Sequence, residues 1–471
     1  MTIKASKAAN FGNGKTIRVP GSKSHTIRAL ILATMSEGNT KITNPLKSAD
    51  ALSTAKAVQK IGAKVTFHDE ENYWLVEGCG NNIHLPEDEI DVGNSGSLMY
   101  FISPVLATLP GRCVINGDES IQKRPVVHLT DALTKMGANA FSQKEGSVCP
   151  PFEFTGPINN NKVLVTEGKL SQYISGIMMA STRLTGTTKL ELTDPQETPY
   201  LSMTKYWLDK YGVESTISDD YKNISVTGPV TLKAHDVIIP SDWEAVAFPL
   251  IAALIANENI VISDIDDSGT QGDEKIVELL QDYGADIIWD KKTKTLEVNP
   301  QLKNKSKNEK HLLNRILSVK GTEKTINMAA YPDAICALCV IACFADGKTV
   351  FTDIDICRKK ETDRIVVMTE LLKSLGADIE DKGDTLVING HSPFVKTPNG
   401  IENNPEFKMH GGTVDSYLDH RVAMSLACYG LFLPETDAVY VKDAECCNVS
   451  FPGFFDTMNS SLGTEFVSAD K

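Results

Sequence analysis

The chain has 471 residues, of which 41% are hydrophobic and 23% charged, and its formal net charge is -14 at pH 7. These values are typical of a globular protein with two or three domains, and the acidic balance argues against nucleic acid or an anionic membrane as the main partner. Since no apolar run approaches the roughly 18 residues of a membrane span and the first residues lack the apolar core of a signal peptide, we expect a cytoplasmic protein.

The first informative stretch follows a short strand predicted over 15–19. An apolar helix is predicted to start just after Pro20-Gly21, because Ser22 and Ser24 are N-cap residue types and residues 29–33 are strongly apolar. Lys23 then lies where free backbone N–H groups and the positive end of the helix dipole converge, and Arg28 lies one turn further on, on the face of Ser24. The pattern predicts an anion site, although an ordinary helix cap with a solvated lysine has the same sequence.

An internal repeat organises the whole chain. Each copy carries a very apolar helix that leads into a strand, and later an amphipathic helix that ends at a glycine before a further strand. We expect these glycines to be C-caps with a positive φ; they are Gly62, Gly137, Gly212, Gly284, Gly376 and Gly463. The copies predict six βαβαββ-type units, three in each of two domains, with inner helices shielded by outer sheets. The long fourth interval contains the Lys- and Asn-rich segment 299–324, which we interpret as a solvated insertion.

Polar clusters of the first half precede several of the predicted helices. A Gly-rich turn that contains Asn94 and Gly96 enters the apolar helix of the second unit, and Arg124 stands just before a proline that opens another helix. Segments 170–173 and 198–200 offer hydroxyl and amide groups near helix starts. These groups suit a phosphorylated or polyhydroxy ligand, and ordinary turns and caps explain them equally well.

The second half carries denser charge. Asp333 stands at the start of an apolar helix, where a capping role and a functional role are both open. Lys360 and Arg364 are spaced by one helical turn with Glu361 beside them, a pattern that a surface salt-bridge ladder shares. Segment 419–421 carries an acid, a histidine and an arginine into another apolar helix, and we interpret its histidine as an orienting partner.

The cysteines predict packing and no metal. Ten cysteines are too few for a disulfide scaffold of this length, and most lie in apolar segments, which favours reduced, buried thiols. Cys336, Cys339 and Cys343 have metal-like spacing but lie on one apolar helix with no histidine pair nearby. We therefore expect them in the core, and we expect neither a metal nor a cofactor.

The charged clusters recur at related positions of duplicated units, so we expect them to face one cleft between the two domains. Such a cleft would concentrate positive charge in an otherwise acidic protein, and a small polyanion is its natural ligand. Asp333 and Glu361 are candidates for proton transfer among these cations. The cations are Lys23, Arg124, Lys360, Arg364 and Arg421.

Taken together, these motifs resemble those of the enolpyruvyl transferases and, among them, the EPSP synthase family, over essentially the whole chain and in the same order. The motifs are Gly21-Ser-Lys-Ser, Gly93-Asn-Ser-Gly, Lys123-Arg-Pro, Ser171-Gln172, Pro332-Asp333, Lys360-Glu-Thr-Asp-Arg364 and Asp419-His-Arg. The resemblance implies an α/β fold of two inside-out α/β barrel domains. The first would comprise 1–20 and 241–471 and the second 21–240, with the active site in the cleft between them.

The resemblance also implies a monomeric transferase of the shikimate pathway to chorismate and the aromatic amino acids. Its reaction would move the enolpyruvyl group of phosphoenolpyruvate to the 5-hydroxyl of shikimate 3-phosphate, without metal or cofactor. Implied catalytic residues are Lys23, Asp333 and Glu361. Implied phosphoenolpyruvate ligands are Lys23, Asn94, Gly96, Arg124, Gln172, Arg364 and Arg421. Implied shikimate 3-phosphate ligands are Lys23, Ser24, Arg28, Ser171, Gln172, Tyr200, Asp333 and Lys360.

Several positions depart from the pattern of the family. Tyr100 stands where an arginine is usual, Leu170 and Glu197 where serines often contact the acceptor phosphate, Ile356 where asparagine is frequent, and Val449 where many members have lysine. Two alternatives therefore stay open: an enolpyruvyl transferase with another hydroxyl acceptor, and a non-catalytic anion-binding relative. An acceptor of the UDP-N-acetylglucosamine type is disfavoured, because the loop cysteine of that branch is Glu119 here.

Overall fold

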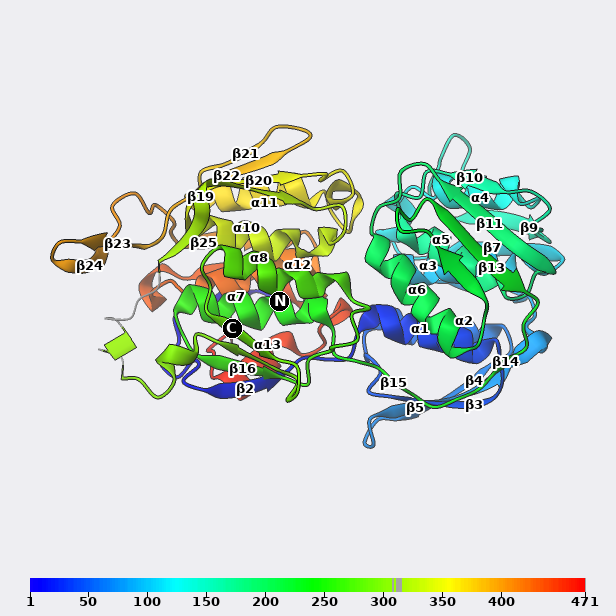
Figure 1. Ribbon diagram of the computed structural model, residues 1–471, viewed down its shortest axis with the longest axis horizontal. Coiled ribbons are helices and arrows are strands. Elements are labelled where there is room, and N and C mark those ends of the chain that lie inside the picture. Colours follow the sequence, from blue (N-terminus) through cyan, green and yellow to red (C-terminus); the bar gives the residue numbers. More distant parts are fainter. Residues whose placement is uncertain (307–308, 311–315, 471) are drawn as a thin grey trace. The chain divides into compact units, whose positions relative to one another are not determined.

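The computed structural model describes residues 1–306, 309–310 and 316–470 (Figure 1). The chain divides into two compact units. Unit 1 consists of Met1–Pro20 and Ser241–Lys471, and unit 2 consists of Gly21–Pro240. The chain thus leaves unit 1 just after its second strand and returns 220 residues later, so unit 2 is a continuous insertion into unit 1.

The sheets of unit 2 share one topology. In each, the second strand of the sheet order pairs in parallel with one outer strand and antiparallel with the third strand, which pairs antiparallel with the other outer strand. In two of the sheets the parallel outer strand comes first in the chain, and in the remaining sheet it comes from the end of unit 2. Two sheets are β6(Ile90–Asp91)-β7(Gly111–Asn116)-β9(Phe152–Gly156)-β8(Asn139–Ser142) and β10(Leu164–Thr166)-β11(Gly186–Leu192)-β13(Asn223–Gly228)-β12(Ser215–Ile217). Another is β3(Ser36–Thr43)-β5(Tyr73–Cys79)-β4(Lys64–His68), whose parallel partners are β14(Leu232–Lys233) and β15(Val237–Ile238).

Unit 1 repeats this topology with one difference. Its sheets are β2(Lys15–Arg18)-β16(Ile260–Ser263)-β18(Thr295–Val298)-β17(Ile287–Asp290), β19(Leu317–Asn327)-β20(Ala345–Thr352)-β22(Leu386–Gly390)-β21(Ile379–Asp381) and β25(Gly412–Asp415)-β26(Val439–Lys442)-β1(Ile3–Ala5)-β27(Val467–Ser468). The hairpin β23(Phe394–Thr397)-β24(Gly400–Asn403) stands apart from them. In the last sheet the N-terminal strand β1 lies between β26 and β27, so the two ends of the chain close one sheet.

Each unit places its most apolar helices inside and its amphipathic helices further out. The inner helices of unit 2 are α1(Lys23–Thr34), α3(Gly96–Leu106) and α5(Ser171–Ser181), and those of unit 1 are α7(Trp243–Ala256), α10(Ile335–Cys343) and α12(His420–Gly430). The amphipathic helices are α2(Ala49–Lys60), α4(Val127–Lys135), α6(Thr198–Lys210), α8(Ile276–Asp282), α11(Arg364–Ser374) and α13(Phe454–Leu462). Because nearly all residues of the inner helices are buried, polar side chains gather at their N-termini.

Close helix packing in unit 2 depends on one glycine. Gly176 lies in the middle of α5, and a Cβ there would stand 2.2 Å from the backbone carbonyl oxygen of Tyr100 on α3. The two helix backbones therefore touch at a distance that only a residue without a side chain allows. This contact sets the separation between the start of α3 and the start of α5, both of which carry candidate site residues.

Two expectations about local structure are confirmed. Each glycine predicted to end an amphipathic helix has a positive φ and lies at or just after the C-cap; the values are 117° at Gly62, 106° at Gly137, 71° at Gly212, 81° at Gly284, 95° at Gly376 and 74° at Gly463. Cys336, Cys339 and Cys343 are buried in α10, and the cysteines of the chain are free thiols.

The insertion predicted over 299–324 is wrong in its last part. Residues from Leu317 onward form β19, which pairs in parallel with β20 through a register shift between Ser318 and Glu323. Polar residues on one face of a strand look like a solvated segment in the sequence, because the pairing that makes them a strand is not local. Residues 307–308 and 311–315 of the predicted insertion lie outside the described residues.

Over the described residues, no helix has the length and apolar content needed to cross a membrane. This agrees with the lack of a long apolar run in the sequence.

A buried histidine in unit 2 predicts how stability depends on pH. His25 is 1% exposed and its Nδ1 accepts a hydrogen bond from Nε1 of Trp207 at 3.0 Å. Burial, with the nearby positive charges of Arg28 and Lys210, lowers the pKa of His25 from 6.5 to about 3. Below pH 6.5 the His25 imidazole therefore binds a proton in the unfolded chain but not in the folded chain. The free energy of unfolding consequently falls as the pH falls from 6.5 toward 3.

We expect His25→Gln to flatten this dependence, because glutamine can accept the same hydrogen bond without titrating. Between pH 6 and 4.5 the slope of unfolding free energy against pH should decrease by up to about 1.4 kcal/mol per unit relative to the wild type. Urea unfolding at several pH values measures this. The exposed His84→Gln is the control and should leave the slope unchanged; an equal change in both variants contradicts the role of His25.

Candidate active site

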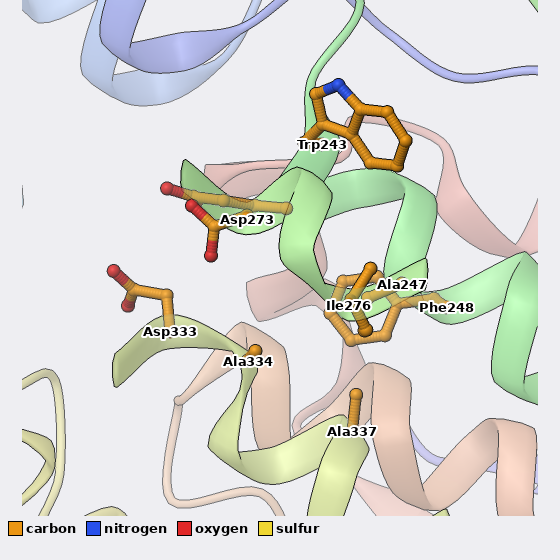
Figure 2. A pocket seen from close by; sticks show the side chains of 9 residues that line it. Trp243, Ala247, Phe248, Asp273, Ile276, Asp333, Ala334 and Ala337 are labelled. Atoms are coloured by element: carbon orange, nitrogen blue, oxygen red, sulfur yellow. The ribbon is translucent and has the colours of Figure 1, made fainter. Parts of the chain in front are cut away.

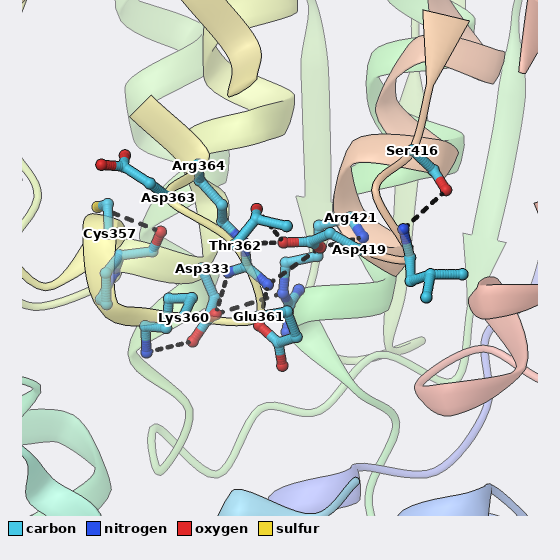
Figure 3. A network of polar contacts seen from close by, with 12 residues as sticks. Asp333, Cys357, Lys360, Glu361, Thr362, Asp363, Arg364, Ser416, Asp419 and Arg421 are labelled. Carbon is cyan, nitrogen blue, oxygen red and sulfur yellow. Dashed lines mark hydrogen bonds and ion pairs between the residues drawn. The ribbon is translucent and has the colours of Figure 1, made fainter. Parts of the chain in front are cut away.

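The charged cluster of unit 1 is centred on Arg364, the first residue of α11, whose side chain is fully buried. Its Nη1 donates to Asp333 at 2.6 Å, its Nη2 to Glu361 at 2.6 Å and its Nε to Asp419 at 2.8 Å (Figure 3). A guanidinium can enter a protein interior only when its donors meet such acceptors. The burial of Arg364 excludes the surface salt-bridge ladder that the sequence left open.

Local caps place these groups. Asp363 caps α11, because its carboxylate accepts from the backbone N–H groups of Ile365 and Val366. Asp419 caps α12 in the same way, through the N–H of Arg421 at 2.9 Å. The start of each helix therefore aims its first side chains at the same point, where a negative charge is also favoured by the helix dipole.

Asp333 lies in the 3-10 turn η5(Pro332–Ala334) that precedes α10, and it does not cap that helix. Besides Arg364, it is approached by Nζ of Lys360 at 3.4 Å and Nε of Arg421 at 3.3 Å. Burial alone would raise the pKa of Asp333, but Lys360, Arg421 and Arg364 outweigh it and hold the pKa well below its usual range. The surrounding cations therefore favour the ionised carboxylate form of Asp333.

Two acids that the sequence analysis missed also belong to this cluster. Glu244, the second residue of α7, forms an ion pair with Nη2 of Arg421. Asp273, in the 3-10 turn η3(Gly272–Lys275), is 4% exposed, and burial followed by the charges of Glu244 and Asp333 raises its pKa well above the usual range. The signal that could have found Glu244 is a single acid within an otherwise apolar helix.

A small pocket opens beside these acids. Its walls are formed by α7, by η3 with the first residue of α8, and by η5 with α10 (Figure 2). The lining residues are Trp243, Glu244, Ala247, Phe248, Asp273, Ile276, Asp333, Ala334 and Ala337. The acids lie at one end and the apolar side chains at the other, so the pocket joins Asp333 to the core of unit 1.

The cluster differs from the basic pocket that the sequence predicts. Lys360, Arg364 and Arg421 do come together, but carboxylates of the same unit compensate their charge. An incoming anion therefore has to exchange with existing ion pairs rather than meet bare cations. Lys360 and Glu361 also lie in the turn before α11 rather than on the helix itself.

In unit 2, α1 starts at Lys23, as the sequence predicts, and an anion site at this helix start stays a prediction. Lys23 is the first residue of the helix, and its Nζ lies 3.6 Å from a carboxylate oxygen of Asp50 in α2. Ser22 takes the N-cap position but its side chain makes no capping hydrogen bond. The serine hydroxyl is thus not needed to start the helix.

Arg28 is buried, with 1% of its surface exposed. Its guanidinium donates to the carbonyl oxygens of Ser24 at 3.0 Å and Tyr200 at 3.2 Å, and to the hydroxyls of Thr204 at 2.9 Å and Ser175 at 3.2 Å. Burial lowers the pKa of Arg28 to about 9, although it remains a cation at neutral pH. Its charge therefore acts on the start of α6 and on the neighbouring Ser24.

Asn94, Gly96 and Arg124 come together at the start of α3. Arg124 Nη2 donates to the side-chain oxygen of Asn94 at 3.1 Å and to the hydroxyl of Ser120 at 3.3 Å. Within the described residues, the buried Nε of Arg124 has no hydrogen-bond partner. A buried donor without an acceptor is costly, so this corner is prepared for an anion.

Ser171 begins α5, and Tyr200 lies in the first turn of α6. The backbone N–H and the hydroxyl of Ser171 both donate to the Glu197 carboxylate, at 3.1 and 3.0 Å. Gln172 follows on α5 and is half-buried, and Tyr200 is 7% exposed. A carboxylate of the chain itself thus holds the donors at the start of α5.

The other departures from the family pattern are packed residues. The Tyr100 hydroxyl donates to the carbonyl oxygen of Pro125 at 3.0 Å, and burial raises the pKa of Tyr100 well above its usual range. Leu170 packs on the core of unit 2, and Ile356 is 2% exposed. Val449 lies half-buried in the 3-10 segment η8(Ala444–Val449). These positions contribute packing in place of charge.

Comparison with known proteins identifies the family. The family model of EPSP synthase (3-phosphoshikimate 1-carboxyvinyltransferase) matches residues 13–458. The chain is 35% identical over 462 residues to the 3-phosphoshikimate 1-carboxyvinyltransferase of Acetivibrio thermocellus, covering 98% of both chains. It is 31% identical over 446 residues to the enzyme of that name from Methanocaldococcus jannaschii, covering 94% of this chain and 95% of the relative.

Solved structures agree on the fold. The EPSP synthase of Acinetobacter baumannii matches with a TM-score of 0.76 at 24% identity, over 99% of this chain and all of that chain. The enolpyruvyl transferase NikO of Streptomyces tendae matches with a TM-score of 0.74 at 15% identity, over 99% of this chain and 98% of that one. The mixed α/β fold, the charged clusters near the starts of its helices and the near full-length sequence matches lead to one conclusion: the chain belongs to the EPSP synthase (3-phosphoshikimate 1-carboxyvinyltransferase) family.

Proposed function

We propose that the chain transfers the enolpyruvyl group of phosphoenolpyruvate to the 5-hydroxyl of shikimate 3-phosphate, releasing phosphate. The observation that carries the proposal is the buried network in which Lys360, Arg364 and Arg421 surround Asp333, within a chain of this family. Such a network offers cations for two anionic substrates and a carboxylate beside them. The cytoplasmic location, the monomeric state and the absence of a cofactor stay predictions.

The proposed substrate contacts follow the sequence expectation. Those for phosphoenolpyruvate are Lys23, Asn94, Gly96, Arg124, Gln172, Arg364 and Arg421. Those for shikimate 3-phosphate are Lys23, Ser24, Arg28, Ser171, Gln172, Tyr200, Asp333 and Lys360. The unsatisfied Nε of Arg124 supports its share in this set, because an anionic oxygen would supply the acceptor that this donor lacks.

The chemistry needs three proton transfers: one to the methylene carbon, one away from it, and one from the acceptor hydroxyl. A proton must reach the methylene carbon of phosphoenolpyruvate while the acceptor hydroxyl attacks C2, and a proton must leave the resulting methyl group as phosphate departs. We assign the proton transfers at the methylene carbon to Glu361 and Lys23, and the deprotonation of the acceptor hydroxyl to Asp333. In the free protein Asp333 is a weak base, because three cations stabilise its charge. Anionic substrates that draw Lys360 and Arg421 toward themselves would raise its basicity at the moment it is needed.

The finer architecture is part of the proposal. The recurring sheet topology of both units supports six βαβαββ-type repeats, three in each unit, arranged as inside-out α/β barrels with the inner helices enclosed by sheets. The domain assignment of 1–20 with 241–471 and of 21–240 is part of the same proposal.

A substitution at Gly96 tests the phosphoenolpyruvate contacts. A Cβ on Gly96 would stand 3.1 Å from Nη1 of Arg124, closer than most such contacts. We expect Gly96→Ala to push the guanidinium by a few tenths of an ångström and to raise the KM for phosphoenolpyruvate about three- to tenfold, with the KM for the acceptor unchanged. Steady-state kinetics measure both constants. Ser97→Ala, at the next position of α3, is the control; an unchanged KM in Gly96→Ala would remove Arg124 from the proposed contacts.

One observation favours a second candidate function. The Glu197 carboxylate holds the donors of Ser171, which the proposal assigns to the acceptor. An enolpyruvyl transferase for a different hydroxyl acceptor would explain a negative charge at that point.

A phosphate-release assay distinguishes the two candidate functions. Release from phosphoenolpyruvate is measured with and without shikimate 3-phosphate, and the organic product is identified by mass. Release that depends on the acceptor, with a product of the mass of the enolpyruvyl ether, supports the proposal. No release despite binding of phosphoenolpyruvate would favour a different acceptor.

A further inference from the structure

The start of α5 is occupied by a negative charge that belongs to the protein. Glu197 is 1% exposed, and one of its carboxylate oxygens accepts both from the backbone N–H and from the hydroxyl of Ser171. These two donors point at a single oxygen, with distances of 3.1 and 3.0 Å. The arrangement is the one that a helix N-terminus offers to an anionic ligand, and here a side chain takes it.

The backbone at Glu197 is held in a conformation that few residues adopt. Its φ of 51° lies in the left-handed region, although Glu197 is neither glycine nor asparagine and stands directly before α6. A side chain at this position normally caps the following helix, but Glu197 makes no capping hydrogen bond with α6 and reaches α5 instead. Strain of this kind persists only where the surrounding structure enforces it, and it clusters at functional sites.

The surroundings of Glu197 include residues that the proposed function assigns to the acceptor. Tyr200 lies one turn along α6, and its carbonyl oxygen accepts from the Arg28 guanidinium at 3.2 Å. Burial lowers the pKa of Arg28, and the charges of Tyr200 and Glu197 act against this effect, so Glu197 and Arg28 interact electrostatically. Ser171, Tyr200 and Arg28 thus border one buried carboxylate.

We propose that Glu197 is the specificity-determining residue for the charge of the acceptor. Its carboxylate occupies the donors of Ser171 and repels a phosphate group that approaches them. Glu197 therefore reduces the preference of the enzyme for the phosphorylated acceptor over the same acceptor without phosphate. This inference rests on the proposed function, because it takes Ser171 as an acceptor ligand.

Two variants separate the effect of the negative charge of Glu197 from the effect of its occupying the Ser171 donors. Glu197→Gln keeps the length of the side chain and an oxygen for Ser171 but removes the negative charge. Glu197→Asn is too short to reach Ser171 in the same way, and asparagine adopts the left-handed conformation more readily than glutamate. Glu191→Gln, which removes one exposed negative charge on β11 of the same unit, is the matched control.

The experiment measures the dissociation constant of shikimate 3-phosphate by calorimetry without phosphoenolpyruvate, and the ratio of kcat/KM for shikimate 3-phosphate to kcat/KM for shikimate. We expect at least one of the two Glu197 variants to bind shikimate 3-phosphate about tenfold tighter or more, the size of effect that a like charge a few ångströms away produces in a buried site. The ratio of kcat/KM should rise by the same factor, with the KM for phosphoenolpyruvate unchanged and the control equal to the wild type.

The inference is overturned if neither Glu197 variant binds shikimate 3-phosphate more tightly than the control does. Binding is measured without turnover, so the result stands even if the wild type forms no product. A wild type that neither binds nor converts shikimate 3-phosphate, together with a Glu197 variant that gains binding, would support the role of Glu197 while refuting the proposed acceptor. Turnover of shikimate 3-phosphate by the wild type, together with unchanged binding in the Glu197 variants, would support the proposed acceptor and refute the role of Glu197.

Discussion

Replacing Asp333 by asparagine is expected to lower kcat by about two to four orders of magnitude, the usual cost of losing a general base. Asparagine has nearly the same size and can still accept hydrogen bonds from Arg364 and Lys360, so the geometry of the turn before α10 should persist. What it cannot do is take a proton from the acceptor hydroxyl. The KM for phosphoenolpyruvate should change much less than kcat, because Arg364 and Arg421 keep their other carboxylate partners, Asp419 and Glu244.

The matched control for this variant is Asp381→Asn. Asp381 also pairs with an arginine of unit 1, because Nη2 of Arg358 donates to it at 2.5 Å, but it lies on β21 outside the cluster around Arg364. Steady-state kinetics at saturating substrates, with folding checked by circular dichroism, compare the two variants. An Asp333→Asn protein with the kcat of the wild type would remove Asp333 from the proton transfer.

Replacing Arg364 by methionine is expected to cost about 3–5 kcal/mol of unfolding free energy, because it leaves buried carboxylates without their cation. Three carboxylates, those of Asp333, Glu361 and Asp419, accept hydrogen bonds from this one guanidinium. The Arg364 side chain has no exposed surface, so water cannot take its place. The loss should shrink as the pH falls, since carboxylates without a cation take up protons more readily in the folded state. Activity should be lost as well.

Urea unfolding at pH 7 and at pH 5 measures both parts of this prediction. Arg112→Met is the control, because Arg112 pairs with Glu153 on an exposed strand and an exposed pair contributes about 1 kcal/mol or less. Equal destabilisation in both variants would mean that the network around Arg364 adds nothing beyond an ordinary surface pair. A loss that does not depend on pH would point to packing rather than charge.

Local features of this protein could be predicted from its residues because the physics behind them is local. Gly62 and the glycines equivalent to it follow amphipathic helices, and a positive φ there needs only the absence of a side chain. Lys23 stands at the start of an apolar helix for the same kind of reason, since the helix begins where Ser22 ends the extended segment. The free, buried cysteines of α10 follow from the apolar composition of that helix.

Features that depend on residues far apart in the sequence could not be predicted from it. The strand β19 is rich in polar residues, so its sequence indicated a solvated insertion, and only its pairing with β20 makes it a strand. Asp333 was equally consistent with a helix cap, and the difference lies in Arg364, 31 residues away along the chain.

By itself the sequence determined the apolar inner helices, the set of charged residues near helix starts and, through the order of its motifs, the family. Only the tertiary structure decided which charges meet. Arg364 pairs with Asp419, 55 residues away along the chain, and Arg421 pairs with Glu244, 177 residues away. Glu197 accepts a hydrogen bond from Ser171 rather than capping the helix that follows it. The physical reason is that an ion pair depends on distance in space, while composition and periodicity report only neighbours along the chain.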